Sequence, residues 1–191
     1  MARIASTTLH ACVLMALLAC AATEPEILLV PHSAVAPAGV DFSGTWVIRE
    51  DESAGRRSIN RALGQAGGLG KQPSSRHRNG QELVHVFLET GSTLKITQTQ
   101  FGFFVSIDRS VVEEFRFGEK RMVNVGEIEG QRVSGWDGDV YTVQTLDKSG
   151  MKLIDRFWLS DDKEVLVREI TFRSRKDEDA SVMQFFDRRD R

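Results

Sequence analysis

The chain has 191 residues, of which 41% are hydrophobic and 27% are charged, and its formal net charge is −2. These values are typical of a soluble globular domain. They exclude collagen-like and proline-rich architectures, and they exclude a nucleic-acid-binding protein that depends on overall positive charge.

Both cysteines, Cys12 and Cys20, lie near the N-terminus. If the chain is cut before Cys20, the remaining domain has no disulfide, no cysteine nucleophile and no Cys-ligated metal site. Its stability must then come from the hydrophobic core alone.

Residues 1–19 are predicted to be a signal peptide. Arg3 supplies a short positive region, and Leu9–Leu18 supplies the apolar region that follows it. A membrane-spanning helix needs ~20 apolar residues. His10 interrupts the run, so the segment is too short to remain as a span.

The four residues Leu17-Leu18-Ala19-Cys20 resemble the lipobox of bacterial lipoproteins. The resemblance implies cleavage before Cys20 and attachment of lipid to that cysteine. Because Ala21 rather than Asp follows it, the resemblance also implies anchoring to the periplasm-facing outer membrane if the host is Gram-negative. The alternative is ordinary cleavage at Ala19-Cys20-Ala21, which would release a soluble periplasmic or secreted protein.

Residues 20–40 contain three prolines and lack regular periodicity, so we expect a tether between membrane and domain. The short apolar run Ile27–Val30 within it could instead add a strand or cover a sheet edge.

From Asp41 to Arg191 the pattern indicates a β domain. Apolar and polar residues alternate in short stretches rich in β-branched and aromatic side chains, as in half-buried strands. The predicted strands are Gly44–Ile48, Thr93–Gln98, Phe103–Asp108, Val111–Phe117, Met122–Ile128, Arg132–Trp136, Val140–Leu146, Lys152–Leu159, Val165–Phe172 and Val182–Phe186.

Short turns separate these strands. Gly118-Glu119, Gly130-Gln131 and Asp137-Gly138 are predicted turns, the last a type I′ hairpin. Parallel strands need long crossovers. The fold class is therefore all-β, an antiparallel up-and-down meander closed into a barrel or a strongly bent sandwich.

An insertion at residues 53–81 interrupts the strand pattern. Ile59, Ala62, Leu63 and Ala66 have the spacing of one short helix that ends at Gly67-Gly68, and the remainder is a Gly/Arg-rich loop. Between Ala54 and Gly80 there are six Lys or Arg residues and no Asp or Glu. Either this loop contacts anionic lipid headgroups, or its charge merely keeps it solvated.

Motifs for catalysis and for metal binding are not found. There is no G-x-S-x-G elbow, and Glu113 and Glu114 would point to opposite faces of one strand. The aspartates near Asp137 and Asp161 lack the spacing of a calcium loop, and the histidines are scattered. We therefore expect a non-enzymatic protein with no cofactor, no bound metal and no nucleic-acid partner.

Gly44-Thr45-Trp46 resembles the G-x-W of the first strand of lipocalin-like barrels, and the segments around Trp136-Asp137-Gly138 and Trp158-Leu159-Ser160 resemble those of bacterial lipocalin-like domains. The resemblance implies a barrel that binds a small apolar molecule or has a structural role in the envelope. It also implies an arginine over the tryptophan, for which Arg188 is the candidate.

The sequence favours two functions over a third, an envelope hydrolase, for which no catalytic constellation is found. In the first, a lipid-anchored envelope protein binds a small hydrophobic ligand inside its barrel. The loop 53–81 would then act as a lid, and the expected lining residues are Trp46, Phe103, Val105, Tyr141 and Phe157. In the second, the interior is filled by these aromatic side chains, and the protein docks an envelope protein partner or inhibits an enzyme.

Overall fold

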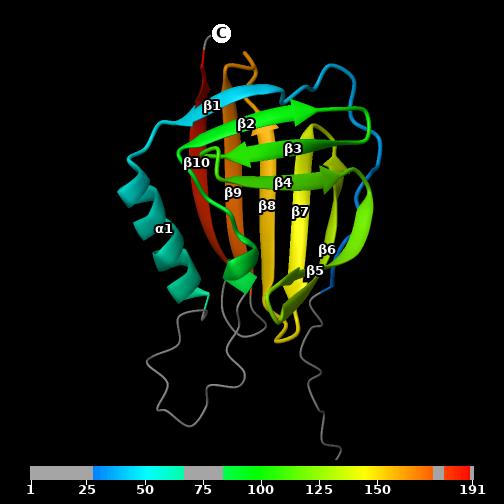
Figure 1. Ribbon diagram of the computed structural model, residues 1–191, viewed down its shortest axis with the longest axis vertical. Helices are drawn as coiled ribbons and strands as arrows, with labels where there is room; N and C mark the ends of the chain where they lie inside the picture. Colours follow the sequence, from blue (N-terminus) through cyan, green and yellow to red (C-terminus); the bar gives the residue numbers. More distant parts are fainter. Residues whose placement is uncertain (1–27, 67–83, 174–178, 190–191) are drawn as a thin grey trace, which may run out of the picture.

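The structure is a computed structural model that describes residues 28–66, 84–173 and 179–189. One antiparallel sheet of ten strands curls into a nearly closed β-barrel (Figure 1). The elements in chain order are β1 (Gly44–Ile48), α1 (Glu52–Gln65), the 3₁₀ helix η1 (Val84–Phe87), β2 (Thr93–Gln98), β3 (Gly102–Ile107), β4 (Val111–Arg116), β5 (Glu119–Val125), β6 (Ile128–Asp137), β7 (Val140–Asp147), β8 (Lys152–Leu159), β9 (Val165–Arg173) and β10 (Ala180–Arg188).

The strand order is β4-β3-β2-β1-β10-β9-β8-β7-β6-β5. Every pairing except that of β1 with β10 joins strands that follow each other in the sequence. The predicted all-β, up-and-down antiparallel barrel is therefore confirmed. β4 and β5 are the two ends of the sheet and do not pair with each other.

One predicted turn is wrong. Gly130 lies inside β6, paired with Val123 on one side and Asp147 on the other, and the chain turns earlier at Gly126, where φ is +61°. The predicted strand 122–128 is accordingly split between β5 and β6. Gly130 lies in a closely packed part of the strand, because a Cβ there would lie 3.0 Å from Cγ2 of Thr145 and 3.2 Å from a ring carbon of Phe87.

The predicted hairpin at Asp137-Gly138 exists, but its turn type differs from the prediction. Asp137 pairs with Val140, which leaves two residues in the loop. A type I′ turn requires positive φ at both loop residues. Only Gly138 has one, at +58°, as in a type II′ turn.

Helix α1 is longer than the sequence predicted, with 14 residues. The four apolar residues that predicted it, Ile59, Ala62, Leu63 and Ala66, are all buried in one cluster with Ile170, Phe172 and Val182 from β9 and β10. Residues 67–81 of the predicted insertion lie outside the described residues.

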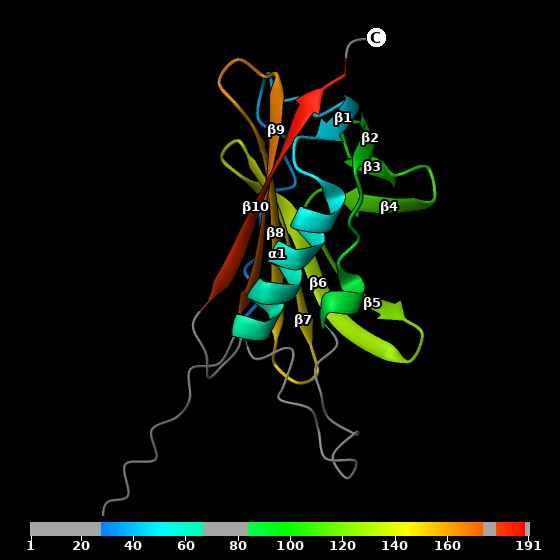
Figure 2. The same ribbon diagram turned by 90° about the vertical axis from the view of Figure 1, so that its left-hand side faces the viewer.

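The position of α1 follows from the strand lengths. β1 pairs only with Phe186–Arg188 at the end of β10, so β1 leaves the rest of β10 without a partner on that side. There α1 lies against β9 and β10, and η1 lies against β7 and β8 (Figure 2). Among the described residues, no helix is long and apolar enough to cross a membrane.

The end of the barrel away from η1 is filled by aromatic side chains. Phe103 lies 4.5 Å from Tyr141 between ring centres, and Phe42 lies 5.3 Å from Trp136. Trp46 is fully buried beside them and donates its indole N–H to the carbonyl of Phe42 at 2.9 Å. The expected arginine contact is present, because the Arg188 guanidinium lies 4.2 Å from the Trp46 ring centre.

Part of the predicted tether is attached to the barrel. Ser33 exchanges two backbone hydrogen bonds with Trp136, beyond the point where β5 stops pairing with β6. Val30 donates its backbone N–H to the Gln144 side chain at 3.1 Å, and the Lys152 ammonium donates to the carbonyl of Leu28 at 2.7 Å. Residues 28–33 therefore lie against β6, β7 and β8.

We expect Lys152 to make the stability of the fold depend on pH. Its side chain is buried, and this burial, with lesser repulsion from Arg173 and Arg156, lowers its pKa to about 8. Above this pKa the unfolded chain binds more protons than the folded chain, so the free energy of unfolding rises with pH until the unfolded pKa is reached.

Urea unfolding of the wild type and Lys152→Met, at about pH 7 and about pH 10, measures this effect. The wild type should gain on the order of 1 kcal/mol relative to the variant over this range. A difference between the two proteins that does not change with pH would contradict the prediction.

Candidate functional site

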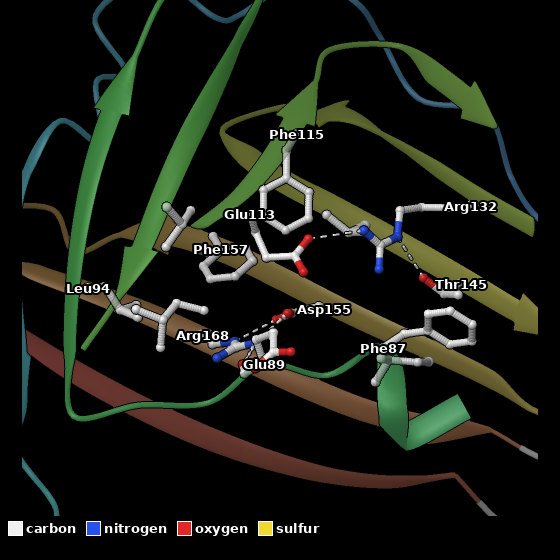
Figure 3. A pocket seen from close by; sticks show the side chains of 14 residues that line it. Phe87, Glu89, Leu94, Glu113, Phe115, Arg132, Thr145, Asp155, Phe157 and Arg168 are labelled. Carbon is white, nitrogen blue, oxygen red and sulfur yellow. Dashed lines mark hydrogen bonds and ion pairs between the residues drawn. The ribbon is translucent and has the colours of Figure 1, made fainter. Parts of the chain in front are cut away.

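A pocket lies inside the barrel between the aromatic end and η1 (Figure 3). The depression holds about 450 Å³ of empty space, counting the part open to solvent, but the space within it that a water-sized sphere can enter is only about 20 Å³. That is room for about one water molecule. The pocket is lined by Phe87, Glu89, Leu94, Val105, Ile107, Glu113, Phe115, Arg132, Val143, Thr145, Leu153, Asp155, Phe157 and Arg168.

One of the two arginines in this pocket is held by a bidentate ion pair. Arg168 from β9 is 4% exposed and donates to both carboxylate oxygens of Asp155 on β8, at 2.9 and 2.6 Å. It also donates to the backbone carbonyl of Glu89 at 3.0 Å and lies 5.2 Å from the centre of the Phe157 ring. A buried arginine needs such a bidentate partner, because an unpaired buried charge is costly.

The second arginine is held less completely. Arg132 from β6 donates its Nε–H to the Thr145 hydroxyl at 3.1 Å and one Nη to the Glu113 carboxylate at 3.3 Å. Figure 3 shows its third nitrogen directed toward the interior of the pocket, and among the described residues it has no hydrogen-bond partner. Burial of the side chain lowers the pKa of Arg132, and the Glu113 carboxylate acts in the opposite direction.

The barrel has an open side, because its end strands β4 and β5 do not pair with each other. Side-chain contacts join β4 to β5, β6 and β7 across this open side, and we call these contacts the seam. The backbone carbonyl of Arg116 accepts hydrogen bonds from the Ser134 hydroxyl at 2.9 Å and from the Tyr141 hydroxyl at 3.3 Å. The carbonyl of Glu114 accepts from Arg121 at 3.2 Å, and the Glu113–Arg132 pair completes the set. The unpaired edge of β4 is thus partly satisfied without a neighbouring strand.

Three of the expected lining residues are elsewhere. Val105 and Phe157 line the pocket, whereas Trp46, Phe103 and Tyr141 are buried in the aromatic cluster that closes the far end of the barrel. In the predicted lid, Ser53–Gln65 is helical and packs on β9 and β10, and most of the remainder lies outside the described residues.

The polar groups of the pocket were missed from the sequence, although a signal for them exists. Arg168 has the same strand parity as Leu166 and Ile170, and Asp155 has the same parity as Leu153 and Phe157. Successive side chains in a strand point to opposite faces. A charged residue within an otherwise apolar inward row is therefore the pattern that would have identified both.

Comparison with known proteins gives structural likeness only. No protein-family model and no curated protein match the sequence. Among solved structures, the REP1-NXSQ fatty acid transporter aligns with TM-score 0.49 and 10% identity over 79% of this chain and 98% of its own. Fatty-acid-binding protein 1 of Echinococcus granulosus has TM-score 0.48 and 14% identity over 77% and 96%. The fluorescent protein UnaG has TM-score 0.47 and 17% identity over 78% and 97%.

The Arg168–Asp155 pair gives a test of the buried charges. Asp155→Asn removes the counter-charge and should cost ~3–5 kcal/mol of unfolding free energy, because the Arg168 cation is left buried without a partner. Replacing both residues with apolar ones, as Asp155→Leu with Arg168→Met, should cost clearly less. Urea unfolding measures both effects.

The matched control is Asp187→Asn, which breaks an exposed pair with Arg49 and should change stability little. Equal destabilisation by the single and the double replacement at the buried pair would contradict this account of its energetics.

Proposed function

We propose that this protein is a lipid-anchored protein of the cell envelope that binds one small hydrophobic molecule in the interior of its barrel, and that it is not an enzyme. The observation that carries the binding function is a pocket lined mainly by apolar side chains in which one guanidinium nitrogen of a buried arginine, Arg132, has no hydrogen-bond partner among the residues that the structure describes. Ligand sites commonly combine apolar walls with a few polar groups that fix orientation.

The ligand has to widen the pocket. The space that a water-sized sphere can enter, about 20 Å³, does not hold a molecule larger than water, so a ligand must displace side chains of the pocket wall. We expect the apolar part of the ligand to lie among side chains such as Val105, Ile107 and Phe157. A hydrogen-bond acceptor at one end of it would face Arg132.

Membrane attachment through Cys20 is the second part of the proposal. Leu28, where the described chain begins, is held to the barrel by Lys152. At ~3.4 Å per residue, the chain from Cys20 to Leu28 spans at most ~30 Å. The anchor would therefore keep the barrel close to the bilayer surface, where apolar ligands are concentrated.

Ligand binding is tested with an uncharged probe, a dansyl-labelled C11 alcohol. Energy transfer from tryptophan should reveal saturable binding to the purified wild type. Val105→Phe places a larger side chain in the pocket wall and should weaken binding at least ~10-fold, a difference of ~1.4 kcal/mol. The control is Val112→Phe on the neighbouring strand, where the valine is 66% exposed and the change should have no effect.

A second function is favoured by the small cavity and by a group of exposed apolar side chains. Phe101, Phe104 and Val112, in the β2–β3 turn and on β3 and β4, are 71%, 45% and 66% exposed. They would suit a barrel with a filled core that docks an envelope protein. If neither this probe nor the matching carboxylic acid binds the wild type, or if the probe binds Val105→Phe equally well, this second function replaces the first.

The anchor is tested by labelling cells with radioactive palmitate. Cys20→Ser should abolish labelling and release the protein from the membrane fraction, because it removes the thiol that carries the lipid. Cys12→Ser, within the cleaved segment, should leave both unchanged. Labelling that persists in Cys20→Ser would show that this cysteine is not the attachment site.

A further inference from the structure

Glu113 lies between the incompletely bonded arginine and solvent. Its side chain is 27% exposed, whereas the Arg132 side chain is 6% exposed. The pair is joined by a single contact of 3.3 Å, in contrast to the bidentate contacts of 2.9 and 2.6 Å between Arg168 and Asp155. Of the two arginines in the pocket, Arg132 therefore has the carboxylate that is easier to replace.

The same contact belongs to the seam. It joins β4 to β6, which do not pair through their backbones. The buried end of the seam, where Ser134 and Tyr141 donate to the carbonyl of Arg116, does not depend on it. Loss of the Glu113–Arg132 contact would thus loosen one part of the open side, next to the pocket, while the rest of the seam holds.

We propose that Glu113 occupies the place of a ligand's acidic group, and that the ligand is an amphipathic carboxylate which displaces Glu113 from Arg132 as it enters between β4 and β6. This inference rests on the proposed binding function and names the chemical class of its ligand. Glu113 then acts as an internal competitor that keeps the empty pocket closed.

Charge balance favours a carboxylate over a neutral group. When a ligand carboxylate replaces Glu113, Arg132 exchanges one negative partner for another. The partly exposed Glu113 side chain then rotates outward into the solvent. An alcohol in the same place would leave the buried cation without a counter-charge, which is costly. Two further carboxylates line the pocket, those of Glu89 and Asp155. Asp155 is already paired with Arg168, so Arg132 is the cation left for the ligand.

The test compares two dansyl-labelled C11 probes, an acid and the matched alcohol, on the full chain, with detergent-only blanks. Glu113→Gln weakens the internal competitor, so the acid should bind several-fold more tightly and associate faster, whereas alcohol binding should change less than about twofold. Arg132→Gln should weaken acid binding at least about tenfold and alcohol binding far less.

The control is Glu114→Gln, which neutralises the next residue on the same strand. Glu114 pairs with Arg116 on the surface and does not line the pocket, so both probes should bind as to the wild type. If Arg132→Gln does not fold, as judged by circular dichroism, the comparison of the two glutamate variants decides alone.

The outcomes separate the two proposals. If neither probe binds the wild type, the binding function itself fails. If both probes bind equally, and Glu113→Gln behaves like Glu114→Gln, the function stands and the carboxylate exchange is overturned.

Discussion

The open side between β4 and β5 is the constraint on which the rest of the structure depends. Ten strands curl round, but the two end strands do not meet through backbone hydrogen bonds. Carbonyl groups on the free edge of β4 still need donors, because unpaired backbone groups are costly when shielded from water. Ser134, Tyr141 and Arg121 supply those donors from the other side. Side chains therefore close the barrel where the backbone cannot.

This arrangement determines where the interior is closed and where it can open. At the Arg116 end of the seam, the donors are buried next to the aromatic cluster, in which Phe103, Phe117 and Tyr141 are in mutual contact. Burial of such side chains contributes ~1.5–3 kcal/mol each and accounts for much of the stability. Further along β4, the link is the partly exposed Glu113–Arg132 pair, and the pocket lies beside it.

The polar groups of the pocket do not serve stability in the same way. Buried ion pairs seldom stabilise a fold more than apolar residues of similar size would, because both ions must be desolvated. Arg168 and Asp155 form a bidentate pair, while Arg132 has a single, longer contact of 3.3 Å with Glu113. Of the two cations in the pocket, Arg132 is thus the one with the weaker contact to a carboxylate.

Much of the architecture was determined by the sequence alone. Period-two alternation and closely spaced turns are local properties, and they predicted the ten strands and their up-and-down order. The apolar spacing from Ile59 to Ala66 likewise predicted a helix in the insertion. The position of Gly130 was misread, because a glycine in a closely packed part of a strand looks in sequence like one that makes a turn.

Only the tertiary structure decided which inward residues meet. Arg132 and Glu113 come from strands that are not paired, and Arg168 and Asp155 from adjacent strands whose register sets them together. It also decided that Trp46, Phe103 and Tyr141 fill one end of the barrel while Val105 and Phe157 line a pocket. Alternation tells which face of a strand a residue occupies. The depth of that residue along the barrel depends on strand register and on the position of α1 and η1, which are set by contacts distant in sequence.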